Sequence, residues 1–237
     1  MNAKIIEQRI VWFIRHVTKG SSVVVGLSGG IDSSTVAALC VRALGKDKVV
    51  GLILPEKGLS KIQDVEDARE LAVTLGIAYH IHPINDVLDG LKLSLPFLAS
   101  NKSALGNAKA RIRMMMLYSY ANAFNYRVAG TGNKSELHVG YFAKYGDGGV
   151  DFLPIGDLVK HEVRMLATHL EIPSCIVDKT PTAGLWQGQT DEKELGFTYE
   201  ELDNAVRGRS STVAAQVKKM HGESKHKREM PPICVLR

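Results

Sequence analysis

The hydrophobic positions along this chain alternate between a helical spacing and short, uninterrupted apolar runs. Residues 3–18 place Ile6, Ile10 and Ile14 on one stripe of a helix. The β-branched run at 21–26 ends in small residues, which is typical of a buried parallel strand that leads into a tight turn. The same patterns predict helices at 3–18, 31–45, 60–76, 84–100, 107–124, 157–173 and 198–220, and strands at 21–26, 48–55, 77–84 and 126–130.

Strands and helices alternate, and this alternation predicts an α/β fold: a doubly wound parallel sheet flanked by helices, with residues 1–237 in a single domain. Ser60 is the expected N-cap of one helix, and Gly45 and Gly76 are expected to end two others. Neither an internal repeat nor a linker divides the chain.

Two segments lack a clean period. Residues 138–156 are rich in glycine and tyrosine, which indicates an ordered functional loop. Residues 180–196 are polar and contain Gly184, Gly188 and Gly196, so we expect this segment to form a mobile lid over a site.

Composition is that of a globular protein, because 45% of the 237 residues are hydrophobic and 23% are charged, which argues against disordered, collagen-like and coiled-coil classes. Charged residues or glycine interrupt every apolar run before it could cross a bilayer. The N-terminus is too charged for a signal peptide, so we expect a cytoplasmic protein with no membrane partner. Cys40, Cys175 and Cys234 form no CxxC pair, and buried or incidental thiols are the expected state of all three.

The net charge of +5 is concentrated near the end of the chain. Residues 207–237 carry +6, from eight Lys or Arg and two Glu, which leaves −1 for the rest. Such a segment is compatible with a solvated tail, with a clamp for phosphates or with nucleic-acid binding.

The sharpest motif lies between the first strand and the following helix and consists of Gly26, Leu27, Ser28, Gly29, Gly30, Ile31, Asp32 and Ser33. Adjacent glycines let the backbone approach an anion, and a helix start offers free N–H groups and the positive end of its dipole. Asp32 would repel a phosphate unless a cation lay between them, so it implies Mg²⁺. The loop matches neither GxxxxGK[ST] nor GxGxxG, and a glycine-rich turn alone can be purely structural.

The residues SGGIDSS at 28–34 resemble the pyrophosphate-binding loop of the N-type ATP pyrophosphatases, which have the adenine nucleotide alpha hydrolase-like fold. This resemblance implies that ATP is cleaved to AMP and pyrophosphate and that a substrate is adenylated in between. Later blocks narrow the resemblance to the NAD synthetases, in that family's order: NAKARIRMMMLY, GTGNKSELHVGYFAKYGDGGVDFLPIGDLVK, PTAGLWQGQTDEKELG and HKR. The similarity runs from about residue 20 to about residue 230.

The resemblance to NAD synthetases implies that residues 26–33, with Thr131, Lys160 and Thr182, hold ATP. It also implies that Asp32 and Glu136 bind Mg²⁺ and that Asp32, Lys160 and Thr182 are catalytic. Taken alone, Glu136 would be interpreted as an exposed loop carboxylate and Lys160 as a solvated residue in the first turn of a helix.

Five further residues are implied to hold deamido-NAD: Arg111, Lys144, Asp151, His226 and Lys227. The last two lie in a basic C-terminal segment, 221–230, which would fold over the phosphates of the substrate. Without the resemblance, Arg111 could equally form a surface salt bridge, Asp151 could form a turn, and the terminal segment would be a disordered charged end.

The implied reaction is a ligation in which the carboxylate of deamido-NAD is adenylated by ATP and ammonia then displaces AMP to give NAD. Some related enzymes use glutamine and carry an added domain with a catalytic cysteine, which this chain lacks, so we expect free ammonia or a separate ammonia-supplying partner. The resemblance also implies a homodimer. Tyr118, Phe124 and the region Met114–Met116 would suit an interface or the core equally well.

Three other functions compete with this one. Another ATP pyrophosphatase, of the GMP-synthetase-like or tRNA-modifying kind, would share the loop, although tRNA-thiolating enzymes often use paired cysteines. A nucleotide-binding regulator would keep the fold without activity, and the intact Asp32, Glu136, Lys160 and Thr182 argue against it. An RNA-binding module has little support from the near-neutral remainder of the chain, so we expect no nucleic-acid partner.

Overall fold

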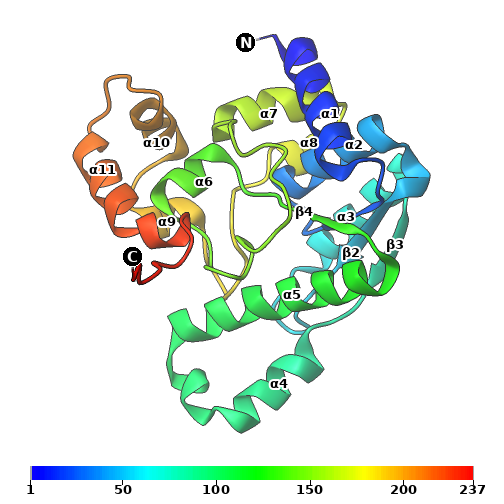
Figure 1. The fold of residues 1–237 in the computed structure, drawn as a ribbon. Helices are drawn as coiled ribbons and strands as arrows, with labels where there is room; N and C mark the ends of the chain where they lie inside the picture. The colour runs from blue at the N-terminus through cyan, green and yellow to red at the C-terminus, as the bar shows by residue number, and fades with distance from the viewer. Residues whose placement is uncertain (1, 237) are drawn as a thin grey trace.

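A sheet of four parallel strands, in the order β3-β2-β1-β4, runs through the computed structural model, which describes residues 2–236 (Figure 1). The strands are β1 (Val23–Gly26), β2 (Val49–Ile53), β3 (Ala78–Ile81) and β4 (Arg127–Ala129). Val23 of β1 lies opposite Val49 of β2 on one side and Arg127 of β4 on the other. The apolar runs of β1 and β2 are buried because helices cover both faces of the sheet, as is usual for parallel strands. The predicted α/β fold with a parallel sheet is therefore confirmed.

The helices are α1 (Ala3–Thr18), α2 (Ile31–Leu44), α3 (Ile62–Leu75), α4 (Asn85–Ser94), α5 (Lys102–Phe124), α6 (Lys134–Val139), α7 (Lys160–His169), α8 (Ser174–Val177), α9 (Asp191–Leu195), α10 (Tyr199–Val206) and α11 (Ala214–Glu223), with 3₁₀ turns η1 (Lys46–Lys48), η2 (Pro96–Ser100) and η3 (Lys225–Lys227).

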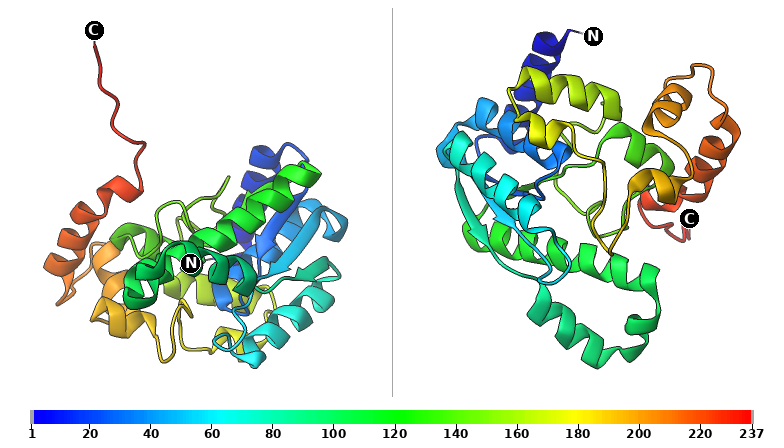
Figure 2. Two further views of the ribbon diagram at one scale, coloured as in Figure 1. Left: turned by 90° about the horizontal axis from the view of Figure 1, so that it is seen from below. Right: turned by 180° about the vertical axis from the view of Figure 1, so that it is seen from behind.

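Successive residues of β1 point to opposite faces of the sheet and so enter different cores. Val23 and Val25 pack with residues of α1, α2, α3, α7 and α8, whereas Val24 packs with residues of α4 and α5. Figure 2 shows the sheet between these two groups of helices. A third cluster of buried side chains joins α6, α9, α10 and α11, and Figure 1 shows α10 and α11 beyond α6, away from the sheet.

Two helix ends lie where the glycines predicted them. Gly45 follows α2 with a φ of +86°, and Gly76 follows α3 with a φ of +68°. The prediction that Ser60 caps α3 was wrong: Lys61 is the N-cap residue, and Ser60 Oγ instead accepts a hydrogen bond from the Glu56 N–H at 3.0 Å.

Other boundaries also differ from the predictions. The helix expected from 107 begins at Lys102, because the Asn101 side chain caps it by accepting from the Ala104 N–H at 2.9 Å. The single helix expected at 198–220 is two helices, and Gly208 lies between them with a φ of +69°. The segment 84–100 is helical but is interrupted at Leu95, where the following proline disfavours a helical conformation.

The cysteines are free thiols in two environments. Cys40 is buried in α2, and burial raises the pKa of its thiol to about 12, whereas Cys175 and Cys234 are exposed. Within residues 2–236, every helix is too short or too polar to traverse a lipid bilayer.

Candidate active site

The loop of residues 27–30, here called the SGG loop, connects the end of β1 to the start of α2. β1 ends at Gly26 and α2 begins at Ile31, so the loop leads directly into the N-terminus of a 14-residue helix. Gly29 has a φ of +74°, and a Cβ atom there would lie 2.1 Å from the carbonyl oxygen of Asp64. Only glycine therefore fits this position.

Hydroxyl groups around the SGG loop bond mainly to the loop itself. Ser28 Oγ lies 3.0 Å from Ser33 Oγ and accepts from the Gly30 N–H at 3.2 Å. Ser33 Oγ accepts from the Ser28 N–H at 3.2 Å, and Ser34 Oγ donates to the Gly30 carbonyl at 2.8 Å. An anion at this helix start would find hydroxyl and backbone N–H donors gathered in one place.

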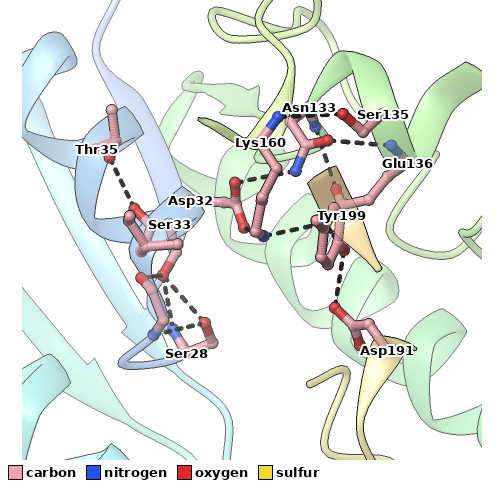
Figure 3. Close-up of polar contacts among 12 residues, drawn as sticks. Ser28, Asp32, Ser33, Thr35, Asn133, Ser135, Glu136, Lys160, Asp191 and Tyr199 are labelled. Carbon is pink, nitrogen blue, oxygen red and sulfur yellow. Dashed lines mark hydrogen bonds and ion pairs between the residues drawn. The ribbon is translucent and has the colours of Figure 1, made fainter. Parts of the chain in front are cut away.

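A buried lysine lies next to this loop, between two carboxylates. Lys160, the first residue of α7, is 4% exposed. Its Nζ lies 2.5 Å from Asp32 Oδ2 and 3.4 Å from Glu136 Oε1 (Figure 3). Lys160 is thus not the solvated residue that its place in a first turn suggests, and Glu136 is not an exposed loop carboxylate.

Asn133 holds both carboxylates in place. Its Nδ2 donates to Asp32 Oδ1 at 3.1 Å. It also caps α6: Asn133 Oδ1 accepts from the Glu136 N–H at 3.0 Å, and Glu136 Oε2 accepts from the Asn133 N–H at 3.2 Å. This reciprocal capping box fixes the direction of the Glu136 side chain.

The start of α7 is fixed by a second buried pair. Ser135 Oγ donates to Asp203 Oδ1 at 2.5 Å and accepts from the Lys160 N–H at 3.1 Å. Asp203 Oδ2 accepts from the His161 N–H at 2.8 Å. These bonds satisfy two of the free N–H groups at the start of α7 and fix the backbone from which the Lys160 side chain extends.

A buried tyrosine and an aspartate close the other side of the cluster (Figure 3). The Tyr199 hydroxyl donates to Asp191 Oδ2 at 2.9 Å and lies 3.4 Å from Glu136 Oε1. The Tyr141 hydroxyl donates to Asp191 Oδ1 at 3.2 Å. Lys160 Nζ lies 5.0 Å from the centre of the Tyr199 ring, within the range of a cation–π contact.

The cluster of Asp32, Asn133, Glu136, Lys160, Asp191 and Tyr199, here called the Lys160 cluster, contains more carboxylates than cations. Burial raises the pKa of Glu136 above its usual value, the Lys160 ammonium opposes this shift, and the charge of Asp32 adds to it. Burial alone would lower the pKa of Lys160, but Asp32 and Glu136 outweigh it and raise that pKa, so the ammonium stays charged. Burial also raises the pKa of Asp191. A further cation would relieve this excess of negative charge.

The Lys160 cluster fits Mg²⁺ that is shared with phosphate. Mg²⁺ is usually bound by one or two carboxylates together with water and substrate phosphates. Asp32 and Glu136 already converge on one cation, the ammonium of Lys160. Within residues 2–236, no three His, Cys, Asp or Glu side chains gather to hold a metal ion by themselves.

The two threonines implied to hold ATP lie in different settings. Thr131 follows β4, between glycines, at the same sheet edge as the SGG loop because β4 pairs in parallel with β1. Thr182 is exposed in the segment 180–196, where its hydroxyl donates to the Gln189 carbonyl at 2.9 Å. The structure therefore brings Asp32, Glu136 and Lys160 together, but it shows no bond between Thr182 and them.

The loop predicted at 138–156 begins two residues later, because His138 and Val139 still belong to α6. Four of the five residues implied to hold deamido-NAD meet along this loop. The Arg111 Nε, on α5, donates to the Lys144 carbonyl at 3.2 Å. Asp151 accepts from the Val128 N–H at 2.7 Å and from the Tyr118 hydroxyl at 3.1 Å.

Lys227 reaches the same loop from the C-terminal segment. Its Nζ donates to the Gly140 and Phe142 carbonyls at 2.6 Å and 2.7 Å. His226 precedes it in η3 and is exposed. Residues 224–228 are thus packed against α6 and this loop, whereas residues 229–236 are exposed.

Sequence reasoning missed Asn133, Ser135, Asp191, Tyr199 and Asp203. The pattern Asn-x-x-Glu at 133–136 is a capping-box signal and could have identified Asn133. The other four carry no local signal, because their partners lie between 8 and 68 residues away.

The parallel sheet, the SGG loop and the Lys160 cluster at its carboxyl edge define an ATP pyrophosphatase of the PP-loop fold. Residues 6–231 match the model of the NAD synthase family. The chain belongs to the NAD synthase family.

Individual relatives agree with this assignment over the full length of the chain. The NH(3)-dependent NAD(+) synthetase of Archaeoglobus fulgidus is 51% identical, over 100% of this chain and 99% of the relative. Among solved structures, NMN synthetase from Francisella tularensis has a TM-score of 0.91 at 38% identity and covers 99% of both chains. The NH3-dependent NAD synthetase of Campylobacter jejuni, in complex with the nitrate ion, has a TM-score of 0.82 at 36% identity and covers 99% of this chain and 100% of that one.

Removal of the Tyr199 hydroxyl tests how strongly the Lys160 cluster depends on its polar partners. We expect Tyr199→Phe to lower the free energy of unfolding by about 1–3 kcal/mol, because Asp191 would lose a buried donor while almost no volume is lost. Tyr145→Phe is the matched control, because Tyr145 is 56% exposed, and we expect a change within about 0.5 kcal/mol. Urea unfolding followed by circular dichroism measures the free energy of unfolding of both variants. Equal values would contradict the role of the Tyr199 hydroxyl as a stabilising donor to Asp191.

Proposed function

We propose that this chain catalyses the ATP-dependent amidation of deamido-NAD to NAD, with ammonia as the nitrogen donor and AMP and pyrophosphate as the other products. The observation that carries the proposal is the buried Lys160 ammonium beside the N-terminus of α2, at the carboxyl edge of β1 and β4. Membership of the NAD synthase family supports the substrate. The full-length similarity to relatives named NH(3)-dependent NAD(+) synthetase supports ammonia.

In the first half of the reaction, the nicotinate carboxylate attacks the α-phosphorus of ATP and forms an acyl-adenylate. The SGG loop and the N–H groups at the start of α2 bind the leaving pyrophosphate. Lys160 neutralises the charge that develops on the phosphate oxygens, and its burial strengthens this effect. Loss of a single preorganised donor of this kind typically costs about 10²–10³ in rate.

In the second half, ammonia attacks the carbonyl carbon of the adenylate and AMP leaves. No side chain forms a covalent bond in this scheme. The chain acts by holding the reactants in position and by excluding water, which would otherwise hydrolyse the adenylate.

The segment 180–196 is proposed as the lid that excludes water. Lys109 of α5, which pairs with Glu56 at 2.7 Å, also donates to the Leu185 carbonyl at 2.8 Å. Lys102 lies 4.3 Å over the ring of Trp186. Both contacts hold the segment against α5, and its closure over ATP would bring Thr182 to the nucleotide.

Deamido-NAD is proposed to bind along the loop of residues 140–156. Arg111 and Lys144 would contact its negative groups, Asp151 would accept from ribose hydroxyls, and His226 with Lys227 would cover its phosphates from the C-terminal segment. The contacts of Arg111 and Lys227 with backbone carbonyls of this loop support a common site.

Asp32 and Glu136 are proposed to hold Mg²⁺ together with the phosphates of ATP. When bound, the ion would neutralise negative charge on the phosphates. A cytoplasmic location is proposed as well, and the three free cysteines are typical of proteins in a reducing compartment.

The proposed activity is tested with purified protein, ATP, Mg²⁺ and deamido-NAD, with either ammonium or glutamine as the nitrogen source. We expect NAD and AMP to appear in equal amounts with ammonium and no NAD with glutamine alone. ATP binding without NAD formation would contradict the proposal and would point to the nucleotide-binding regulator or to another adenylated substrate.

A second candidate substrate follows from the similarity to the NMN synthetase of Francisella tularensis. That protein's name implies the amidation of a mononucleotide, which the same adenylation chemistry would perform. The same assay is therefore repeated with nicotinate mononucleotide in place of deamido-NAD. The compound with the higher kcat/KM is the preferred substrate. We expect deamido-NAD to be preferred, because the relatives with the higher identities are named NAD(+) synthetases.

The proposed Mg²⁺ site is tested by Asp32→Asn and Glu136→Gln, which remove a charge without changing shape. We expect the Mg²⁺ concentration for half-maximal activity to rise about tenfold or more in each, because each removes one of only two protein carboxylates. Glu66→Gln is the matched control, because Glu66 pairs with Arg69 on the surface of α3. The rate of NAD formation is measured at increasing Mg²⁺ concentrations for the wild type and each variant. A half-maximal Mg²⁺ concentration that is unchanged in Asp32→Asn and Glu136→Gln would contradict the proposed metal site.

We also propose a homodimer formed through the groove between α4, η2 and α5. The groove has a volume of about 900 Å³, and its apolar lining includes Val87, Leu95 and Met115, which are 39–48% exposed. Arg111 lines the same groove, so a second copy seated there would lie beside the proposed deamido-NAD site.

A charge in this groove tests the dimer. We expect the wild type to have twice the mass of the 25.9 kDa chain and Met115→Asp to be monomeric, because the carboxylate would lose its water in the interface. Val73→Asp, at a 60% exposed position of α3, is the control and should remain dimeric. Sedimentation equilibrium distinguishes these outcomes, and a monomeric wild type would contradict the proposal.

A further inference from the structure

Lys179 immediately precedes the segment 180–196, and its side chain points back to the SGG loop. Its Nζ donates to the Gly29 carbonyl at 2.9 Å and to Asp64 Oδ1 at 2.7 Å, and it forms an ion pair with Asp67. Two of the three donors of the ammonium group are thus used, and the Asp67 carboxylate lies against the same group. Its charge is paired with two carboxylates, and its contact with the SGG loop is through the Gly29 carbonyl.

The acceptors of Lys179 are themselves held rigidly. Asp67 is 3% exposed, and its Oδ1 accepts from Gln63 Nε2 at 2.8 Å. Asp64 belongs to the first turn of α3, whose backbone lies against Gly29 so closely that no Cβ could fit between them. Lys179 thus joins the SGG loop, α3 and the start of the segment 180–196.

The contact with Gly29 has a direct consequence for the next peptide group. In a planar trans peptide, the carbonyl and the following N–H point in opposite directions. Since the Gly29 carbonyl points to Lys179, the Gly30 N–H points to the other side, where it donates to Ser28 Oγ at 3.2 Å. Glycines on both sides would leave this peptide plane free to rotate, so its orientation depends on the two groups that bond to it, Lys179 at the carbonyl and Ser28 at the N–H.

We propose that Lys179 is a positioning residue for the reaction. It holds the carbonyl end of the Gly29–Gly30 peptide and so keeps the Gly30 N–H on the side of Ser28 Oγ, where the pyrophosphate of ATP would accept from both groups. This inference rests on the proposed function, because that function places pyrophosphate at the SGG loop. Lys179 also connects the start of the proposed lid to the SGG loop. Thr182, the residue of the lid that is implied to hold ATP, makes no such contact and bonds to the Gln189 carbonyl.

Lys179→Met tests this role, but it would also leave the buried Asp67 carboxylate without its cation. The double variant Lys179→Met/Asp67→Asn removes that unpaired charge but still lacks the hydrogen bond to the Gly29 carbonyl. Arg69→Met is the matched control, because Arg69 forms an ion pair on the outer side of the same helix.

We expect both Lys179 variants to raise the KM for ATP and the Kd for inorganic pyrophosphate with Mg²⁺ by about tenfold, because one charge-assisted bond no longer restrains the donor. The KM for deamido-NAD should stay within about twofold in both, and Arg69→Met should match the wild type. Isothermal calorimetry with pyrophosphate and steady-state kinetics give these values.

Three results would overturn the inference: pyrophosphate affinity unchanged in both Lys179 variants, wild-type affinity restored in the double variant, or equal losses for ATP and deamido-NAD. The second would mean that Lys179 only neutralises Asp67, and the third that it only maintains the fold. Failure of the proposed function is separate, because it would appear as a wild type that forms no NAD, while pyrophosphate binding still reports on Lys179.

Discussion

The buried ammonium of Lys160 joins parts of the chain that are far apart in sequence. It contacts Asp32, which lies 128 residues earlier at the start of α2, and Glu136, which lies in α6. A buried ammonium is costly unless carboxylates and hydrogen bonds surround it, so the place of Lys160 at the start of α7 depends on the carboxylates that α2 and α6 supply. The same carboxylates leave the cluster with an excess of negative charge, which suits a metal ion and the phosphates that accompany it.

The order of the strands explains why the cluster forms where it does. From β1 the chain proceeds to β2 and β3 on one side, and β4 then adds on the other side of β1. The connections after β1 and β4 therefore diverge at the carboxyl edge, and open α/β sheets bind ligands at such a point. Asp32 follows β1, and Asn133 and Glu136 follow β4, so the two connections meet at this edge through the Asn133–Asp32 hydrogen bond.

Much of the fold was predictable from the chain itself, because buried parallel strands and helix-ending glycines leave local signals. The valines of β1 and β2 and the caps at Gly45 and Gly76 are examples. The errors came from competition between local partners: Asn101 starts α5 early, and Ser60 bonds to Glu56 instead of capping α3. The site was predictable only in part. The SGG loop is a local motif, but the buried Lys160 side chain is paired with Asp32 and Glu136, which lie 128 and 24 residues away and which no local pattern connects to it.

The most direct test of this account follows the oxygen atoms of the substrate. Deamido-NAD labelled with ¹⁸O in the nicotinate carboxylate is converted by the enzyme with ATP and ammonium in unlabelled water, and the products are analysed by mass spectrometry. The arrangement of the SGG loop and Lys160 predicts one ¹⁸O atom in AMP and none in pyrophosphate, because the carboxylate attacks the α-phosphorus. Label in pyrophosphate or in inorganic phosphate, with none in AMP, would contradict it.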